Sequence, residues 1–491
     1  MNEVEETDVL IVGGGLAGLA VGGRAVLGGL RGTILEKGED DHYICNSRIA
    51  GGAFNLGHSD PMSDPSLLVD AILGDTEGYA DGALASAVAA VAGEAMQWLR
   101  SEGAKFIKVQ RPNSQATWSM APPRPAKPAS HLVRATWEGR GPDHVIRSLT
   151  KNFKARGGKF HLKTRAQRLV FEASRCVGVE AIQNGQLTIF HAQNIVIADG
   201  GFQANPDLVR RFIGPHPEQL TQRNARTGIG DGLLMAEQAG ALLTACDRFY
   251  GHLLVQESAT IDELWPWPTM DTLSSNAIIV DRSGRRFLDE GIGGIPIANA
   301  LAQMEDPLCA TTIFDQPLWD TIGRLEHTPP NPLLVEYGGT VSSADSLDEL
   351  AVKIGLPASA LAETVRVYNA VVETGNFDAL TPPRTSGRMF ATLRSSSRRL
   401  PVAPIRTPPY YAVRLRPGIT YTMGGIAINE RAQVLNRSGE PMLGLYAAGA
   451  CTGGLEGGPV SGYIGGLNKA LALGYIAARS ILEKRELQVS I

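Results

Sequence analysis

The sequence predicts an α/β fold in which helices cover a parallel sheet, and three apolar segments support this prediction. Residues 9–12 (VLIV) form an apolar run of the kind that fills a buried parallel strand. The run ends in residues 13–18 (GGGLAG), after which small and apolar residues continue at helical spacing as far as Ala25. Residues 195–201 (IVIADGG) and 444–449 (GLYAAG) repeat the pattern of a buried strand that ends in glycines.

The glycines after the first predicted strand suit the binding of a dinucleotide. Gly13 permits a tight turn, Gly15 lets the backbone approach a pyrophosphate, and Gly18 lets the helix pack closely on the strand. The helix N-terminus then offers its N–H groups to the phosphates. A second predicted strand, residues 33–35, ends at Glu36, whose carboxylate can accept hydrogen bonds from a ribose. This order of strand, glycines, helix, strand and acid predicts a Rossmann-like dinucleotide-binding domain.

Composition and charge argue against several classes of protein. The 491 residues carry a net charge of -4, which does not suit nucleic-acid binding. The 5 cysteines form no C-x-x-C pattern, which argues against a disulfide framework, covalent haem, an iron–sulfur cluster or another metal site. The first residues (MNEVEETD) run directly into a predicted strand without a signal peptide, and no apolar run reaches the ~20 residues of a membrane span. We therefore expect a cytoplasmic enzyme.

Further motifs extend this pattern along the chain. Residues 46–55 (NSRIAGGAFN) form a polar and then glycine-rich loop that suits backbone beside a flat ring. Residues 230–232 (GDG) precede a predicted helix, and residues 281–290 (DRSGRRFLDE) and 422–429 (TMGGIAIN) follow in order. The set resembles the flavoprotein subunits of succinate dehydrogenase and fumarate reductase, a superfamily that includes the 3-ketosteroid dehydrogenases and tricarballylate dehydrogenase. The resemblance implies FAD as the cofactor.

The resemblance also implies a split architecture. Residues 1–243 and 390–491 would form one FAD-binding domain, and residues 244–389 would form an inserted α+β cap over the isoalloxazine ring. Within this cap, residues 345–375 read as two amphipathic helices. A cap of this kind can close and exclude water during hydride transfer.

The expected attachment of FAD is non-covalent. Quinone-linked members carry a histidine near this loop that bonds to the flavin, and residues 46–54 contain none. Ala450 replaces a glutamate that is common in the superfamily after the last glycine-ended strand. The residues assigned to the FAD site are Gly13, Gly15, Leu16, Ala17, Gly18, Glu36, Lys37, Asn46, Ser47, Gly51, Gly52, Ala166, Ala198, Asp199, Gly200, Gly230, Asp231, Gly449, Ala450, Gly465, Gly466 and Leu467.

Three positions where carboxylate-binding members carry charged side chains differ in this chain. Residues 290–296 (EGIGGIP) hold no arginine where fumarate-type enzymes place their acid. Tyr421 stands where those enzymes carry a histidine, and Tyr463 replaces the arginine that clamps a carboxylate. A phenol in place of a guanidinium removes a bidentate fork and leaves a neutral donor for a single oxygen. These differences favour a ketone as the substrate.

The resemblance to 3-ketosteroid dehydrogenases implies a mechanism. Their Tyr-Pro-Gly-x-Gly segment binds the substrate carbonyl through a phenol and a backbone N–H, and Tyr463 is similar to that phenol. Donors that meet the charge developing on the ketone oxygen acidify the adjacent C–H. A base then takes the α-proton while the β-hydrogen leaves as hydride to flavin N5, which yields an α,β-desaturated cyclic ketone.

We interpret Tyr421 as the base and Tyr463 as the carbonyl donor, although the two roles are interchangeable. A tyrosine base requires a pKa lowered from ~10. Tyr250 is a third candidate member of the catalytic site, and His252 is interpreted as an ordinary polar residue.

Two other functions stay open. An enzyme of the fumarate reductase or tricarballylate dehydrogenase type acts on a carboxylic acid, and it would need an arginine from another position, such as Arg134 or Arg398. A non-catalytic flavin electron carrier would need neither the cap nor the tyrosines. The sequence specifies neither the ketone, nor the direction of the reaction, nor the electron acceptor. The expected partners are therefore a small carbonyl compound and an electron acceptor of unspecified kind.

Overall fold

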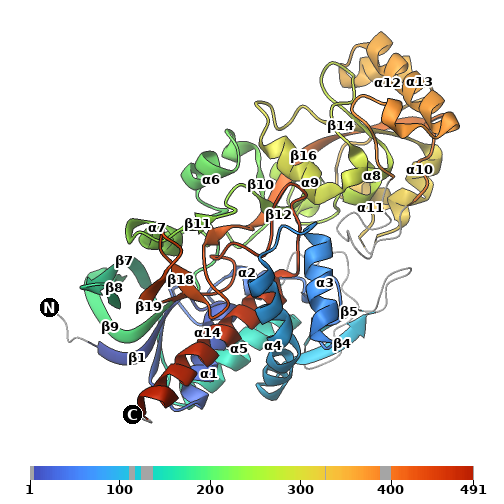
Figure 1. Ribbon diagram of the computed structural model, residues 1–491. Coiled ribbons are helices and arrows are strands. Elements are labelled where there is room, and N and C mark those ends of the chain that lie inside the picture. Colours follow the sequence, from blue (N-terminus) through green and yellow to red (C-terminus); the bar gives the residue numbers. More distant parts are fainter. Residues whose placement is uncertain (1–4, 110–116, 123–136, 327, 387–399, 490–491) are drawn as a thin grey trace.

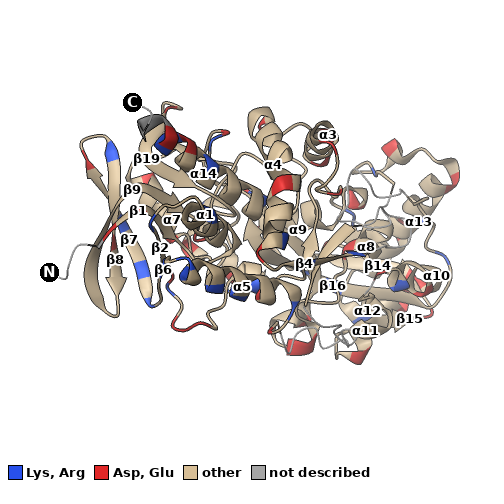
Figure 2. Cartoon of the chain, turned by 90° about the horizontal axis from the view of Figure 1, so that it is seen from below, with Lys and Arg blue, Asp and Glu red and all other residues tan. Residues whose placement is uncertain are grey.

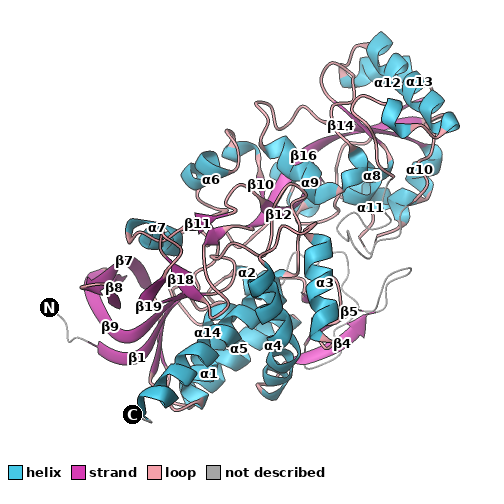
Figure 3. Ribbon diagram, in the orientation of Figure 1, coloured by secondary structure: helices cyan, strands magenta, loops and turns pink. Residues whose placement is uncertain are grey.

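The computed structural model describes residues 5–109, 117–122, 137–326, 328–386 and 400–489. It shows an elongated molecule with a larger body that holds both ends of the chain and a smaller body at the opposite end (Figure 1). Both bodies mix helices and strands (Figure 3), so the predicted α/β class is confirmed. Each body has an apolar core of its own.

The larger body is built on a sheet that has eight strands among the described residues. These strands are β1 (Glu5–Val12), β2 (Gly32–Leu35), β6 (Lys159–His161), β7 (Thr164–Glu172), β8 (Arg175–Gln183), β9 (Gln186–Ile197), β18 (Gln433–Leu435) and β19 (Pro441–Ala447). Their order is β18-β19-β8-β9-β1-β2-β6, with β7 paired to β8. The pairs β1–β2, β1–β9, β2–β6 and β19–β9 are parallel, as predicted for a Rossmann-like domain.

The carboxyl ends of four of these strands meet at one edge of the sheet. Val12 of β1 pairs with Leu35 of β2 and with Ile197 of β9, and Ile197 pairs in turn with Ala447 of β19. The strands predicted from the sequence therefore end side by side. Ligands of open α/β sheets bind outside this edge.

A group of helices packs beside the main sheet (Figure 3). They include α1 (Leu16–Leu27), α4 (Gly82–Ser101), α5 (Gly141–Ala155) and α14 (Gly466–Val489). α1 packs along α14 with small residues between them, since a Cβ on Gly474 would lie 2.6 Å from the Ala17 carbonyl oxygen. Alongside lie α2 (Asn46–Ile49), α3 (Pro65–Asp75) and a small sheet of β3 (Ala53–Phe54), β4 (Lys105–Val109) and β5 (Thr117–Ala121).

The smaller body surrounds a second sheet. Its strands are β10 (Thr221–Gln222), β12 (Phe249–Val255), β13 (Ile278–Val280), β14 (Thr311–Asp315), β15 (Ser342–Ala344) and β16 (Tyr410–Thr422). Its helices are α8 (Asp271–Asn276), α9 (Gly294–Ala302), α10 (Gln316–Asp320), α11 (Pro330–Glu336), α12 (Leu347–Ile354) and α13 (Ala358–Thr374). The other elements include α6 (Pro206–Phe212), α7 (Asp231–Gln238) and the antiparallel pair β11 (Leu243–Thr244) and β17 (Gly425–Ile426).

The two predicted helices of residues 345–375 are confirmed as α12 and α13. Ser346 caps α12 by accepting a hydrogen bond from the Glu349 N–H at 3.2 Å. Gly355 then ends the helix with φ 71°, a left-handed conformation that glycine adopts without strain.

The long strand β16 links the two bodies. Its first half pairs with β14 and β15, and its second half pairs with β12. Residues 390–491 were expected to complete the FAD-binding domain, yet β16 finds the partners for its backbone groups in the sheet of the smaller body. The domain boundaries at 243/244 and 389/390 stay predictions.

Charged residues of both signs are interspersed over both bodies (Figure 2). Within the described part of the chain, no helix combines the length and apolar composition that crossing a membrane requires.

Candidate active site

The glycine-rich turn between β1 and α1 shows why these positions are glycines. Gly13 has φ 107°, and a Cβ there would lie 2.6 Å from the Ala198 carbonyl oxygen. A Cβ on Gly18 would lie 2.0 Å from the Gly13 carbonyl oxygen, so the helix could not pack this close to the strand. A Cβ on Gly15 would instead meet only the Ser47 Oγ at 3.5 Å. Gly15 therefore leaves open space at the N-terminus of α1, where a phosphate is expected.

Glu36 is buried directly beside this turn. Its Oε2 accepts a hydrogen bond from the Gly14 N–H at 2.8 Å, and its Oε1 accepts one from the Gly38 N–H at 2.8 Å. Each carboxylate oxygen has two lone pairs, so both can accept a further bond from a ribose hydroxyl. Glu36 thus holds the turn as well as standing at the predicted ribose position.

The loop around α2 reaches the same place. The Ser47 Oγ accepts the Leu16 N–H at 3.1 Å, next to Ala17 in the first turn of α1. Asn46 donates from Nδ2 to the Thr420 carbonyl at 3.1 Å and accepts the Ala225 N–H at 2.9 Å, so it ties β16 to the loop after β10. The loop then continues through the predicted residues Gly51 and Gly52.

A second group of predicted residues is partly engaged in contacts within the protein. The Lys37 Nζ donates to the Thr227 carbonyl at 2.6 Å and lies 3.5 Å from Asp231, which also pairs with Arg165. Asp199 follows Ala198 and precedes Gly200, and its Oδ2 accepts the Gly232 N–H at 2.7 Å. Burial raises the pKa of Asp199 to about 6. Ala166 is buried in β7, and Gly230 precedes α7 with φ 75°.

The last predicted segment crosses the open edge of the sheet. Gly449, followed by Ala450, has φ 87°, and Gly465 has φ 111° with a Cβ position 2.3 Å from the Asn55 carbonyl oxygen. Gly466 and Leu467 then start α14. Asn468 follows them and was not predicted from the sequence.

Asn468 tests whether this edge fits a polar cofactor. Its side chain is 0% exposed, and neither its Oδ1 nor its Nδ2 has a hydrogen-bond partner among the described residues. The Oδ1 of buried Asp199 is also unpaired there. A buried polar group without a partner costs about 1–3 kcal/mol, and native proteins contain few of them. The residues at this edge therefore fit a ligand with several polar groups, as FAD has.

The three predicted catalytic tyrosines form one aromatic cluster between the bodies. Tyr250 of β12 lies directly opposite Tyr421 of β16, and their ring centroids are 5.4 Å apart. Tyr463, from the loop before α14, stacks on Tyr250 at 4.0 Å between centroids with an interplanar angle of 16°. Tyr250 thus meets two residues that lie far from it in the sequence, and the register of β12 and β16 explains its pairing with Tyr421.

Tyr421 donates its hydroxyl proton to a buried carboxylate. Its Oη lies 2.8 Å from Oε1 and 3.0 Å from Oε2 of Glu456, which is fully buried and pairs with the Lys469 Nζ at 3.0 Å. Burial and the neighbouring Glu456 raise the pKa of Tyr421 well above its usual value. The lowered pKa that a tyrosine base requires is therefore not found at Tyr421.

Tyr250 has a different neighbour. Its Oη lies 3.0 Å from the Nε2 of His252, whose Nδ1 bonds to the carboxylate of Asp271. Burial and nearby Arg223 lower the pKa of His252, and this outweighs the opposite effect of Asp271. A neutral imidazole beside a carboxylate carries its proton on Nδ1, so we assign the Nε2 lone pair as acceptor of the Tyr250 hydroxyl proton. His252 therefore lies in the cluster and connects Tyr250 to Asp271.

Tyr463 makes one hydrogen bond in the described part of the chain. The Gly466 N–H donates to its Oη at 3.2 Å. The hydroxyl proton of Tyr463 therefore has no acceptor among the described residues. Burial and the Tyr250 ring raise the pKa of Tyr463 well above its usual value, so it stays a neutral donor.

Some residues of the site were not recognised in the sequence. Glu456 stands alone in residues 453–458 (GGLEGG), and an acid among glycines near the expected cofactor was a usable signal. Arg223 and Asp271 lie in polar segments that resemble solvated surface, so no signal marked them. Arg134 and Arg398, the arginines considered for the alternative substrate, lie outside the described residues.

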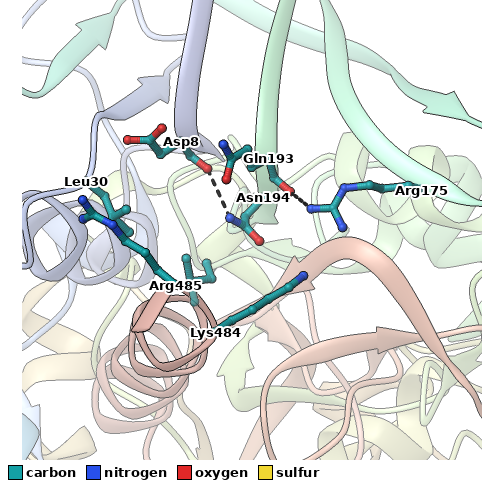
Figure 4. Close-up of a pocket in the computed structure, with 8 residues that line it drawn as sticks. Asp8, Leu30, Arg175, Gln193, Asn194, Lys484 and Arg485 are labelled. Atoms are coloured by element: carbon teal, nitrogen blue, oxygen red, sulfur yellow. Dashed lines mark hydrogen bonds between the residues drawn. The ribbon is translucent and has the colours of Figure 1, made fainter. Parts of the chain in front are cut away.

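A surface pocket lies elsewhere (Figure 4). It lies between β1, β9 and the C-terminal part of α14. Asn194 donates to the Asp8 carbonyl at 3.3 Å, and Arg175 donates to the Gln193 carbonyl, so these polar groups pair across strands. Asp8 is four positions before the carboxyl end of β1 at Val12, away from the edge where the glycines meet.

Fold and site together define a dinucleotide-binding oxidoreductase. The chain belongs to the FAD binding domain family, whose model matches residues 8–462, and FAD is its cofactor. A probable fumarate reductase from Shewanella frigidimarina is 28% identical over 464 residues, which cover 92% of this chain and 71% of that protein. A 4-oxocyclohexanecarboxylate 2-dehydrogenase from Sinomonas cyclohexanicum is 28% identical over 346 residues, 66% of this chain and 58% of that protein.

A solved structure has the same fold. The 3-ketosteroid delta1-dehydrogenase from Sterolibacterium denitrificans matches with a TM-score of 0.73 at 20% identity, over 98% of this chain and 100% of that chain. The chain is thus an FAD-dependent oxidoreductase that is similar in sequence to a fumarate reductase and similar in fold to a 3-ketosteroid dehydrogenase.

Proposed function

We propose that the protein is an FAD-dependent dehydrogenase that introduces a C=C bond next to the carbonyl of a cyclic ketone, of the 3-ketosteroid or cyclohexanone type. The observation that carries this proposal is the cluster of Tyr250, Tyr421 and Tyr463. The family resemblance implies that Tyr421 and Tyr463 stand where carboxylate-binding members carry a histidine and an arginine. A neutral phenol donates a single hydrogen bond, so it suits the oxygen of a ketone better than it suits a carboxylate. The similarity to a 4-oxocyclohexanecarboxylate dehydrogenase supports the same substrate class.

Tyr463 is the proposed donor to the ketone oxygen. Its Oη already accepts the Gly466 N–H, which polarises the O–H and aims its proton away from the backbone. Charge that develops on the ketone oxygen would be met by this preorganised donor, and one such donor typically lowers a barrier by about 3 kcal/mol.

Tyr250 is the proposed base. Its oxygen takes the substrate α-proton while its own proton moves to the Nε2 of His252, and Asp271 stabilises the imidazolium that forms. The electron pair of the α-C–H bond becomes the new C=C bond as the β-hydrogen leaves as hydride. This assignment moves the role of base from Tyr421 to Tyr250, because the neighbour of Tyr250 is a neutral proton acceptor.

Tyr421 is proposed to position Tyr463. Glu456 accepts hydrogen bonds from the Tyr421 hydroxyl and from the Ile464 N–H at 3.1 Å, so it holds β16 against the residue after Tyr463. Lys469 neutralises the carboxylate in this buried place. Such a network keeps the phenols of Tyr421 and Tyr463 in a fixed position relative to each other.

Bound FAD supplies the hydride acceptor. We propose that Glu36 holds its ribose, that the turn from Gly13 to Gly18 holds its pyrophosphate, and that Asn468 contacts it at the open edge. The described part of the loop 46–54 has no histidine, so we propose that FAD is dissociable.

A second candidate is an enzyme that acts on the C–C bond of a carboxylic acid. The similarity to a fumarate reductase and the buried guanidinium of Arg223 near the tyrosines favour it. It does not account for the free hydroxyl proton of Tyr463, and it would need a second carboxylate-binding group.

Anaerobic mixing of the holoenzyme with a substrate panel tests the proposal. The panel contains a 3-ketosteroid, cyclohexanone, 4-oxocyclohexanecarboxylate and succinate, and the loss of oxidised-flavin absorbance is followed. Bleaching by a ketone but not by succinate is expected. Bleaching by succinate alone would replace the proposal with the second candidate.

A further inference from the structure

Arg223 is held rigidly beside the tyrosine cluster. Its N–H donates to the Ile419 carbonyl of β16 at 2.8 Å, which fixes its backbone two residues from Tyr421. Its guanidinium lies over the Trp267 ring at 4.4 Å from the centroid. Its Nε donates to the Pro266 carbonyl at 3.0 Å, and its Nη1 donates to the Thr420 Oγ1 at 3.1 Å.

Arg223 lacks the carboxylate partner that the other buried arginines have. Arg48 pairs with Asp143 at 3.0 Å, and Arg286 and Arg384 pair with Glu290 at 2.7 and 2.6 Å. Arg223 is only 9% exposed, yet it forms no ion pair with any described carboxylate. Its Nη2 makes no hydrogen bond to a described residue.

The nearest acids are committed elsewhere. Asp271 bonds to His252 and accepts the Leu253 N–H at 2.7 Å. Glu326 accepts hydrogen bonds from the hydroxyls of Thr269 and Thr272. Both act on Arg223 through space, without a direct ion pair. A buried cation without an anionic partner among the described residues is unfavourable, so the site is complementary to an anion from outside the protein.

The guanidinium belongs to the same site as the phenols. Trp267 contacts Arg223 on its face and lies 6.0 Å from the His252 ring, and His252 bonds to Tyr250. The Arg223 Nη1 also donates to the Oγ1 of Thr420, which precedes Tyr421 in β16. One small molecule can therefore meet the phenols and the guanidinium together.

We propose that Arg223 binds a carboxylate of the substrate, so that the substrate is a cyclic oxo acid rather than an uncharged ketone. Arginine suits this task because its planar fork binds a carboxylate with two parallel hydrogen bonds, and Nη2 is available for one of them. Trp267 and Thr420 keep the fork in place before the substrate arrives. This inference rests on the proposed function and adds the charged group of the substrate to it.

Binding of a non-reacting acid tests the inference apart from catalysis. Calorimetry measures the Kd of cyclohexanecarboxylate, which lacks the ketone, and of its methyl ester with the wild-type holoenzyme, Arg223→Gln and Arg223→Lys. We expect Arg223→Gln to weaken binding of the acid on the order of 30-fold and to leave the ester nearly unchanged. Arg223→Lys should restore part of the affinity for the acid. Arg226→Gln, an exposed arginine three residues later, is the matched control and should bind the acid like the wild type.

Flavin bleaching separates this inference from the proposed function. The rate is measured with 4-oxocyclohexanecarboxylate and with its methyl ester. If no ketone bleaches the flavin, the proposed function fails, whatever the binding result. If both ketones bleach it and the acid and ester have equal KM in the wild type and in Arg223→Gln, the role of Arg223 is overturned. The role of Arg223 would also be overturned if Arg223→Gln were thermally unstable and lost acid and ester binding equally, and if Arg223→Lys recovered neither.

Discussion

The three tyrosines differ in what their hydroxyl groups contact, and this difference separates their roles. Tyr421 faces an anionic carboxylate, Tyr250 faces a neutral imidazole, and Tyr463 accepts a backbone N–H. A phenolate is unfavourable beside Glu456, whereas a proton can pass from Tyr250 to His252. We therefore expect removal of each hydroxyl to affect the rate of flavin reduction differently.

Replacing each tyrosine by phenylalanine tests these roles. Tyr250→Phe should lower the rate of flavin reduction by roughly 100-fold or more, because it removes the base. Tyr463→Phe should lower kcat by about 100-fold with a smaller change in KM, because the carbonyl donor acts mainly in the transition state. Tyr421→Phe should have the smallest effect of the three. Stopped-flow absorbance at matched FAD occupancy measures all three rates.

Tyr410→Phe is the control for this series. Tyr410 lies at the start of β16, and among the described residues its hydroxyl bonds to the Arg406 carbonyl. It should reduce the flavin at the wild-type rate. A Tyr250→Phe enzyme that still exchanges the α-hydrogens of the ketone with solvent would contradict the assignment of the base.

The pH dependence of flavin reduction tests His252. Burial lowers its pKa below the ordinary value of about 6.5. The imidazole must be neutral to accept the Tyr250 proton, so the rate should hold as the pH falls to 6.5 and decline only at lower pH. The same lowered pKa means that stability linked to His252 is present above pH ~6.5 and is lost as the pH falls through the folded-state value. A rate that already halves near pH 7, in an enzyme with full flavin occupancy, would argue against the relay.

Glu36→Ala tests the ribose contact. We expect FAD binding to weaken by about 1.5–3 kcal/mol, since a charged hydrogen bond is removed. Part of the effect should come from the turn itself, because Glu36 holds the N–H groups of Gly14 and Gly38. The exposed Glu39→Ala is the control. Unchanged flavin affinity in Glu36→Ala, measured by fluorescence titration, would show that this carboxylate does not contact the cofactor.

Residues that act through a family motif could be predicted from the sequence, whereas residues that act through tertiary pairing could not. Tyr421, Tyr463 and Tyr250 do meet in space, as a shared site requires. The partners that distinguish their hydroxyl groups are Glu456 and the pair of His252 and Asp271, which only the folded chain brings next to them. The role proposed for Arg223 likewise depends on its forming no ion pair with a described carboxylate. A sequence does not show which charged side chains pair in the fold.

At the scale of the element, two glycines of the turn between β1 and α1 are expected to serve different purposes, one for packing and one for binding. A Cβ on Gly18 would clash with backbone at 2.0 Å, whereas a Cβ on Gly15 would meet a side-chain oxygen at 3.5 Å. Gly18→Ala should therefore destabilise the fold by about 1–3 kcal/mol. Gly15→Ala should leave the thermal midpoint of the FAD-free protein nearly unchanged and weaken FAD binding at least tenfold.

Gly82→Ala, where the Cβ would meet nothing within 4 Å, serves as the control for both changes. Thermal unfolding with and without added FAD measures the two effects. Equal loss of stability in Gly15→Ala and Gly18→Ala would contradict the distinction between a packing glycine and a binding glycine.

Elements of both bodies were predictable where their sequence patterns are local. Apolar runs that end in glycine identified the carboxyl ends of β1, β9 and β19, and the amphipathic pattern identified α12 and α13. The sheet that β16 joins could not be predicted, because a strand of 13 residues carries no sign of which sheet supplies its partners. That choice depends on the non-local pairing with β12 and β14.

At the scale of the whole molecule, a buried ion cluster secures the smaller body. Glu290 is fully buried and binds Arg286 and Arg384. Both arginines lower the pKa of Glu290 against the opposing and larger effect of burial. The guanidinium of Arg286 is therefore occupied by a partner within the protein.

The attachment of FAD is a property of the whole protein that denaturation tests. Acid precipitation of the holoenzyme should release all of the yellow colour into the supernatant, because the loop 46–54 has no histidine to bond the flavin. Flavin fluorescence that stays with the protein band on a denaturing gel would show a covalent link at another residue.

The central claim is that the enzyme desaturates a cyclic ketone beside its carbonyl, and the product of a single turnover tests it most directly. The holoenzyme is mixed with one equivalent of 4-oxocyclohexanecarboxylate without oxygen, and flavin absorbance and the mass of the organic product are recorded. The account predicts one conjugated enone, lighter than the ketone by two hydrogens, for each flavin reduced. A reduced flavin without enone, or a flavin that no cyclic ketone of the panel reduces, would contradict it.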